Sequence, residues 1–172
     1  WKAPTTKEGW QKVGGTNPAL DDIPFEPHPT KKTGAGVLVM ESDGRVWLTR
    51  PTNNFGGYVH TFPKGTAEDG LSLQQNAIKE AYEETGLKVK IVGVLGDFER
   101  DTSKARFFIA RRVGGNPKDM GWESQAMRLA PMKDALALLN KPHDKDILNA
   151  LGHEMSMLKK AAAAPAKGGA WQ

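Results

Sequence analysis

Three glutamates, Glu80, Glu83 and Glu84, have the side-chain type and the spacing that a metal site requires. On a helix they stand at i, i+3 and i+4, so their carboxylates project from one face with Cβ atoms about 5–6 Å apart. Like charges at this spacing repel, and the last turn of a helix already disfavours negative charge. A hard divalent cation offsets both penalties, because Mg²⁺ prefers carboxylate and water oxygens. The triad alone is more typical of a solvated acidic surface, so its surroundings decide between the two interpretations.

The helix that positions these glutamates is predicted over residues 72–85. Ser72 is a suitable N-cap with Gln75 three residues further on, and Gly86 suits the left-handed position after the last turn. The opposite side of the helix is apolar, with Ala77, Ile78, Ala81 and Tyr82. This stripe predicts that the helix packs on a sheet and holds its acidic face in a fixed direction.

The pattern around this helix predicts further strands and helices. Residues 35–40 indicate a buried strand, which turns at residues 42–44 and returns as a hairpin partner over residues 45–49. The other predicted strands are residues 60–62, 88–95 and 106–112, and the other helices are residues 132–139 and 144–160. This order predicts an α/β or α+β sandwich rather than a doubly wound sheet.

The two ends of the chain lack these patterns. Residues 1–33 are rich in Pro, Gly, Thr and Lys and predict an irregular N-terminal arm, packed by Trp10, Ile23 and Phe25. Residues 161–172 form a low-complexity tail of Ala, Gly, Lys and Pro. The predicted catalytic domain is therefore residues 34–160.

Composition narrows the class of protein. The chain has 172 residues, the size of one domain, and no cysteine, which excludes disulfides and thiolate chemistry and predicts a cytoplasmic location. No apolar run reaches the roughly 20 residues that span a bilayer, so we expect no membrane partner. The net charge of +4 suits an anionic substrate. The basic residues are scattered, so the sequence does not point to RNA binding. RNA is kept as an alternative partner.

Two segments resemble the Nudix box, the signature motif of the Nudix hydrolase family. They are GTAEDGL at residues 65–71 and KEAYEETGL at residues 79–87, preceded by FPKG at residues 62–65. The positions that match the motif without a gap are Gly65, Glu80, Glu83, Glu84, Gly86 and Leu87. The resemblance extends, less specifically, over residues 34–151.

Three positions depart from the box. Leu71 stands where the family usually has glutamate, Lys79 where it has arginine, and Ala81 where it has a larger aliphatic residue. Lysine can contact Glu83 as a point charge, but it lacks the bidentate fork of arginine. These departures put the stiffness of the loop in question more than the metal site, since the three glutamates are retained.

The resemblance implies an α+β fold, a Nudix-type α/β/α sandwich with a mixed central β-sheet. It implies Mg²⁺-dependent hydrolysis of a diphosphate linkage in a nucleoside diphosphate linked to a further group X, with Mn²⁺ as a substitute ion. Glu80, Glu83, Glu84 and the Gly65 carbonyl are the implied metal ligands. The general base in this family is either a box glutamate, here Glu83 supported by Lys79, or a glutamate on a downstream loop. Glu123 stands at the position of this downstream glutamate. The interpretation that Glu123 is an ordinary exposed loop residue has equal weight.

Several residues could hold the substrate. Arg50, Lys64 and Arg106 are the cations nearest the predicted strand ends and box, and Tyr58, Phe55 and Trp47 could stack on a base. Each alone is more typical of surface or core. The basic segment 100–112 faintly resembles members that act on diadenosine and inositol polyphosphates, whereas residues 102–105 match no subgroup marker.

Other functions stay open at this stage. ADP-ribose and 5′-triphosphorylated RNA are alternative substrates. A catalytically weak or inactive Nudix-fold protein that binds a nucleotide and regulates a partner is the alternative in a different class, which the departures at Leu71 and Lys79 slightly favour. The sequence does not distinguish a monomer from a homodimer.

Overall fold

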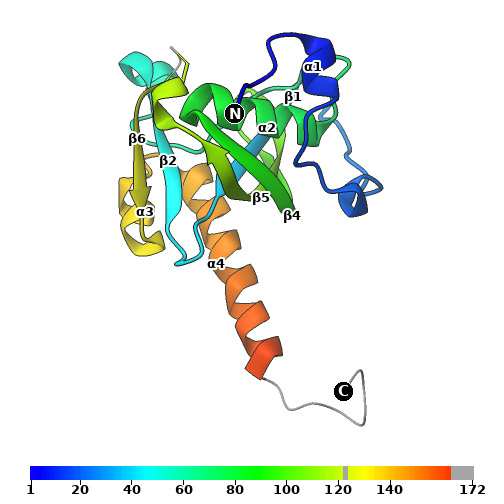
Figure 1. Cartoon of the computed structure of the whole chain (residues 1–172). Helices are drawn as coiled ribbons and strands as arrows, with labels where there is room; N and C mark the ends of the chain where they lie inside the picture. Colours follow the sequence, from blue (N-terminus) through cyan, green and yellow to red (C-terminus); the bar gives the residue numbers. More distant parts are fainter. Residues whose placement is uncertain (122–123, 164–172) are drawn as a thin grey trace.

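The fold is built on a four-stranded sheet with helices on both sides. A computed structural model describes residues 1–121 and 124–163 (Figure 1). The strands are β1 (Lys32–Val39), β2 (Val46–Pro51), β3 (Lys64–Thr66), β4 (Leu87–Glu99), β5 (Ser103–Gly115) and β6 (Ser124–Ala130). The helices are α1 (Lys7–Gln11), α2 (Leu73–Thr85), α3 (Met132–Leu138) and α4 (Pro142–Ala163), with 3₁₀ turns η1 (Pro18–Leu20), η2 (Thr52–Gly57) and η3 (Pro117–Asp119).

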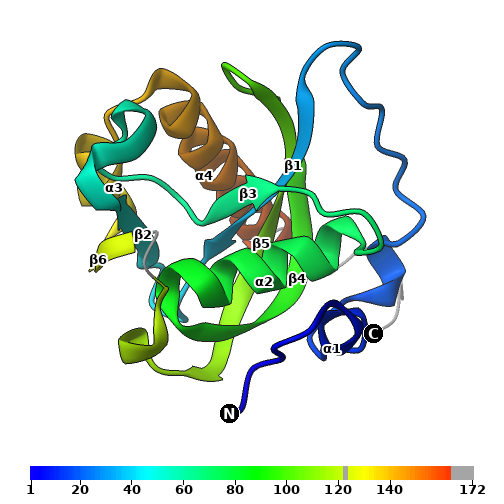
Figure 2. The ribbon, with the colours of Figure 1, turned by 90° about the horizontal axis from the view of Figure 1, so that it is seen from above.

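The central sheet is mixed, as predicted. Its strand order is β3-β1-β5-β4, in which β1 and β5 are parallel and the other pairs antiparallel. A second, two-stranded antiparallel sheet pairs β2 with β6. Seen from above, α2 and α1 lie on one side of the central sheet and α4 on the other (Figure 2). The α+β sandwich expected from the sequence is therefore confirmed.

Alternation along the strands divides the core between the two faces. Leu38 and Phe107 belong to the cluster under α3 and α4, whereas Val37, Val39 and Phe108 belong to the cluster under α2. Successive side chains of a strand point to opposite faces, so each strand contributes to both clusters. This double burial fixes the register of β1 and β5 and with it the position of α2.

The predicted hairpin over residues 35–49 is wrong. β1 and β2 share one isolated bridge, Met40–Val46, and then diverge into different sheets. Both edges of β1 are occupied, by β3 and by β5, so no edge is left for β2. β2 instead pairs with β6, a strand that the sequence patterns did not indicate.

The helix over residues 72–85 is confirmed with its caps. Ser72 and Gln75 form a reciprocal capping box, and Gly86 adopts the left-handed conformation with φ 73°. A Cβ on Gly86 would overlap the Asn116 carbonyl oxygen, so the position needs glycine for space as well as for conformation.

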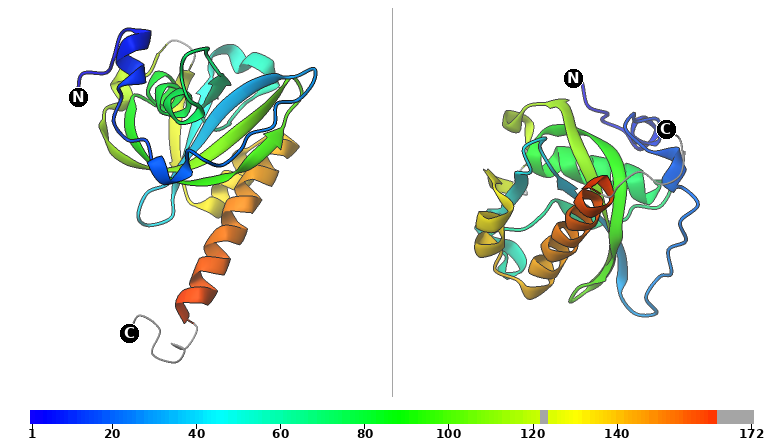
Figure 3. Two further views of the ribbon diagram at one scale, coloured as in Figure 1. Left: turned by 90° about the vertical axis from the view of Figure 1, so that its right-hand side faces the viewer. Right: turned by 90° about the horizontal axis from the view of Figure 1, so that it is seen from below.

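The two ends of the chain also differ from expectation. The arm is not wholly irregular, because Thr6 caps the short helix α1 and the buried Trp10 anchors it. At the other end α4 starts beside the central sheet and its far end extends away from the body (Figure 3). Within the described residues, none of the helices combines the length and the apolar character needed to cross a membrane.

Candidate active site

Two of the three glutamates lie together beside β3. Glu80 and Glu84 are 8% and 7% exposed, and a Glu84 carboxylate oxygen accepts a 2.9 Å hydrogen bond from the Lys64 backbone N–H. The Glu80 carboxylate lies so close to Gly65 that a Cβ there would overlap it. Glycine at position 65 therefore lets the strand backbone and this carboxylate meet.

The electrostatics of this pair suit a cation. Burial, and then the neighbouring Glu80 carboxylate, raise the pKa of Glu84 well above its usual range, although the charge of Lys64 opposes them. Two buried acidic groups side by side are costly unless a positive charge joins them. Mg²⁺ typically binds proteins through one or two carboxylates and takes its other oxygens from water and phosphate. Glu80 and Glu84 therefore fit this ion.

Glu83 does not join its two neighbours, which corrects the expectation of a single acidic face. Its carboxylate lies 3.3 Å from the Lys79 ammonium, four residues earlier on the helix. It lines a separate hollow between α2 and the N-terminal arm. Within residues 1–121 and 124–163, no three acidic or histidine side chains converge as a ready metal cage. The i,i+4 attraction of Lys79 accounts for this split.

Glu68 is a residue that the sequence reasoning missed. Its carboxylate lies 2.9 Å from the Lys79 ammonium, and its backbone N–H donates to the buried Asn76 side chain. Lys79 therefore has two acidic partners, one in the loop and one on the helix. Their interactions raise the pKa of Lys79, although burial alone would lower it. The signal in the sequence was an acidic residue three positions before Leu71, within the same loop.

A cleft of about 1020 Å³ opens over Gly65 and Glu84. Its lining includes Lys32, Phe55, Tyr58, Lys64, Arg100 and Ser103. Phe55 is 82% exposed, on the turn η2, where Asn53 and Asn54 both have positive φ. Residues in this sparsely populated conformation are frequent at ligand-binding sites. The cleft therefore offers an aromatic ring at its rim and acidic and basic groups in its wall.

Lys64 and Tyr58 were both predicted as substrate-binding residues, and both line this cleft. The Lys64 ammonium lies 4.0 Å from the centre of the Tyr58 ring and donates to the Thr61 hydroxyl. Burial, and then the nearby Arg100, lower the pKa of Lys64 to about 8. The Tyr58 ring is occupied by this cation, so it supports Lys64 rather than presenting a free stacking surface.

A buried acid, Asp144 at the start of α4, connects the basic groups of the cleft. It accepts hydrogen bonds from the Thr61 hydroxyl at 2.7 Å and from the Arg100 guanidinium at 2.9 Å. Arg100 also donates to the Tyr58 hydroxyl, which is hydrogen-bonded in turn to His143. The sequence reasoning missed Arg100 and Asp144 as site residues, because 44 positions separate them along the chain.

Two predicted phosphate-binding cations, Arg50 and Arg106, are not among the residues that line the cleft. Arg106 is buried, paired with Asp97, and donates to the carbonyls of Ile23 and Pro24 in the arm. Its strand neighbour Ala105 lines the cleft instead, because alternate side chains of a strand face opposite ways. The prediction for Arg106 is therefore wrong, and its role is to anchor the arm.

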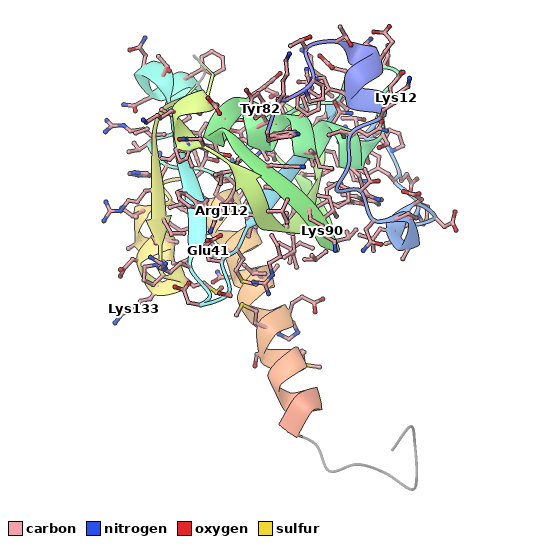
Figure 4. The ribbon with its side chains drawn as sticks, in the orientation of Figure 1. Lys12, Glu41, Tyr82, Lys90, Arg112 and Lys133 are labelled. Atoms are coloured by element: carbon pink, nitrogen blue, oxygen red, sulfur yellow. The ribbon has the colours of Figure 1, made fainter. Side chains whose placement is uncertain are left out.

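Three of the five basic residues in the segment 100–112 are held in ion pairs. Arg100 pairs with Asp144, Arg106 with Asp97 and Arg112 with Glu41. Figure 4 shows the Arg112 and Glu41 side chains together, away from α2. The geometry therefore gives no support to the faint resemblance to proteins acting on very anionic substrates. Glu123, the second candidate for the general base, lies outside the described residues.

Comparison with known proteins identifies one family. The family model described as "NUDIX domain" matches residues 30–151. An RNA pyrophosphohydrolase from Caulobacter vibrioides is 35% identical over 99 residues, which cover 57% of this chain and 55% of that protein. The chain thus spans about half the length of the curated relatives it matches.

Solved structures agree on the fold. A NUDIX hydrolase from Nitrosomonas europaea aligns with a TM-score of 0.64 and 16% identity, covering 72% of this chain and 90% of that one. An ADP-ribose pyrophosphatase from Streptococcus suis aligns with a TM-score of 0.57 and 19% identity, covering 80% and 96%. At these identities the likeness concerns the fold alone.

Proposed function

Since the chain belongs to the Nudix family, we propose that it is a Mg²⁺-dependent pyrophosphohydrolase that cleaves a diphosphate linkage in a nucleoside 5′-polyphosphate. The observation that carries this proposal is the buried pair Glu80 and Glu84 beside Gly65 at the cleft. An acidic pair of this kind is unfavourable in isolation and favourable around a hard cation.

Different residues of the cleft would bind the metal ion and the phosphate groups. Glu80, Glu84 and the Gly65 carbonyl would hold Mg²⁺, which would supply neutralisation of phosphate charge and a bound water molecule of lowered pKa. Lys64 and Arg100 present cationic groups in the same cleft and would hold phosphoryl oxygens. Their contacts with Thr61, Tyr58 and Asp144 fix both cations before substrate arrives, which is the preorganisation that charge stabilisation requires. Glu83 is held by Lys79 in the separate hollow and does not line this cleft, so the geometry does not support it as the general base.

We favour 5′-triphosphorylated RNA as the substrate. The relative that is 35% identical over 99 residues is an RNA pyrophosphohydrolase. The exposed Phe55 at the rim of the cleft supports a substrate with a base, because nucleobases stack on exposed aromatic rings. An inositol polyphosphate has no base to place there, which is why this substrate ranks lower.

The test is a Mg²⁺-dependent hydrolysis screen with native protein and Glu84→Gln. It offers 5′-triphosphorylated RNA, diadenosine polyphosphates, ADP-ribose, nucleoside triphosphates and diphosphoinositol polyphosphates. We expect RNA to lose pyrophosphate or phosphate with native protein and Glu84→Gln to be at least about 100-fold slower, as loss of a direct metal ligand implies. The matched control is Glu154→Gln, an exposed glutamate of α4, which should be unchanged.

Two results would contradict the proposal. Equal turnover by the native protein and Glu84→Gln would remove the acidic pair from the mechanism. Tight binding of one compound without turnover would favour the regulatory alternative. Phe55→Ala then tests the base: we expect KM for RNA to rise about 5-fold or more with kcat unchanged, the effect of losing about 1 kcal/mol of stacking.

A further inference from the structure

The part of the N-terminal arm that precedes β1, residues 1–31, is in direct contact with the box loop, residues 66–72. The Gln11 side-chain amide donates to the Gly70 carbonyl at 3.0 Å, and the Gln11 carbonyl accepts from the Gln75 side chain at 2.8 Å. Gln75 is also the residue that caps α2 with Ser72. One residue of the arm therefore joins the loop to the first turn of the helix.

An apolar contact accompanies these hydrogen bonds. Trp10 of the arm is 4% exposed and belongs to the cluster under α2, together with Ile78 and Ala81. Leu71 of the box loop is half-buried and packs against the same cluster. Leucine at this position therefore attaches the loop to the apolar cluster under α2, and a carboxylate there would lose solvation without an observed partner.

The ion pairs of the loop lie directly under the arm. Glu68, Lys79 and Glu83 line a hollow of about 390 Å³ whose other wall includes Lys7 and Trp10 of the arm. Glu68 and Lys79 join the loop to α2, and Lys79 in turn contacts Glu83. A displacement of the arm would therefore release the loop that carries Glu68, the loop partner of Lys79.

We propose that the arm is a positioning element of the active site, acting through Gln11 and Trp10 on the box loop, whose Glu68 pairs with Lys79 of α2. It holds the loop next to Leu71, the position where the Nudix box usually has glutamate and where this chain has a side chain packed against the apolar cluster. The loop leads from Gly65 to α2, so its position sets the distance between Gly65 and the carboxylates of Glu80 and Glu84. The inference rests on the proposed function, because it concerns the same metal site.

The experiment measures Mn²⁺ binding without substrate, by electron paramagnetic resonance, for native protein, Gln11→Glu and Lys12→Ala. Gln11→Glu keeps the size of the side chain and the backbone contact with Gln75 but removes the donor to Gly70. Lys12 is exposed and labelled on the outer side of the arm in Figure 4, so it is the matched control. We expect the Mn²⁺ dissociation constant to rise about 10-fold in Gln11→Glu, the size of effect of a residue that supports a metal ligand. It should not change in Lys12→Ala.

Kinetics then distinguish positioning from folding. Gln11→Glu should lower kcat at limiting Mg²⁺ and leave KM for the substrate unchanged, and excess Mg²⁺ should restore most of kcat. Glu68→Gln should behave alike, and the double variant should lose less than the product of the two single effects, because both act on one loop.

The outcomes separate the two proposals. Native protein that binds no Mn²⁺ would overturn the metal site and the proposed function with it. Native protein that binds Mn²⁺, with Gln11→Glu binding it equally well, would overturn the role of the arm and leave the proposed function intact. A lower unfolding temperature without a change in Mn²⁺ affinity would also overturn it, because the arm would then serve stability alone.

Discussion

The acidic and basic groups on the two sides of α2 differ in how deeply they are buried. On the cleft side, Glu84 and the Arg100–Asp144 pair are almost completely buried. On the arm side, the Glu68–Lys79 pair is partly exposed, and Glu68 is itself a surface residue. Buried charges depend on every partner, because an unpaired one is strongly destabilising, whereas exposed pairs contribute little to stability.

This difference separates stability from positioning. The cleft side joins α4 to Arg100, which directly follows β4, and to Thr61 before β3, so its charges stabilise the fold in addition to their proposed role in binding substrate. On the arm side, the partly exposed Glu68–Lys79 pair contributes little to stability, and its proposed role is to position the box loop. Three substitutions test how burial separates stability from positioning, from the largest expected effect on stability to the smallest: one in the buried ion pair of the cleft, one at the proposed metal site and one in a surface ion pair.

Asp144→Asn should have the largest effect on stability. It removes the charge that faces the buried Arg100, and the carboxylate is 0% exposed. We expect the free energy of unfolding to fall by about 3–5 kcal/mol, measured by urea denaturation. Asp146→Asn, an exposed neighbour on α4, is the control and should stay close to native. Equal stability of the two variants would contradict the assignment of the cleft side to the fold.

Gly65→Ala should affect the metal site more than the fold. The added Cβ would meet the end of the Glu80 side chain, which can move aside, so we expect less than about 1 kcal/mol of lost stability. The displaced carboxylate should weaken Mn²⁺ binding by about 10-fold or more. Calorimetry of unfolding and of Mn²⁺ binding would measure both. Loss of stability with full metal affinity would show that Glu80 is not a ligand.

Glu41→Gln measures how much a surface ion pair outside both regions contributes to stability. The hydrogen bond from Arg112 is the largest influence on Glu41 and lowers its pKa below 4.5. A lowered pKa in the folded state stabilises the protein above the unfolded value of 4.5, and this contribution disappears as the pH falls through the folded value. Since Arg112 is exposed, we expect less than about 1 kcal/mol at pH 7 and a difference between variant and native protein that shrinks as the pH falls below 4.5. A loss as large as that of Asp144→Asn would contradict the distinction between buried and exposed pairs.

The sequence alone predicted the elements that depend on neighbouring residues. Ser72, Gln75 and Gly86 define the ends of α2 through contacts of a few residues, and the structure confirms all three. The hairpin over residues 35–49 failed for the opposite reason. Its turn was local, but the partners of β1 were decided by strands far along the chain.

The candidate site divides in the same way. The Nudix box contains both the spacing of Glu80 and Glu84 and the glycine that lets Glu80 approach β3. Both could be predicted from sequence, because helical periodicity and glycine geometry act over a few residues. Tertiary structure alone decided that Asp144 meets Arg100 and that Gln11 meets Gly70, 59 positions away. Such contacts follow from the order of strands in the sheet and from burial, which no local spacing encodes.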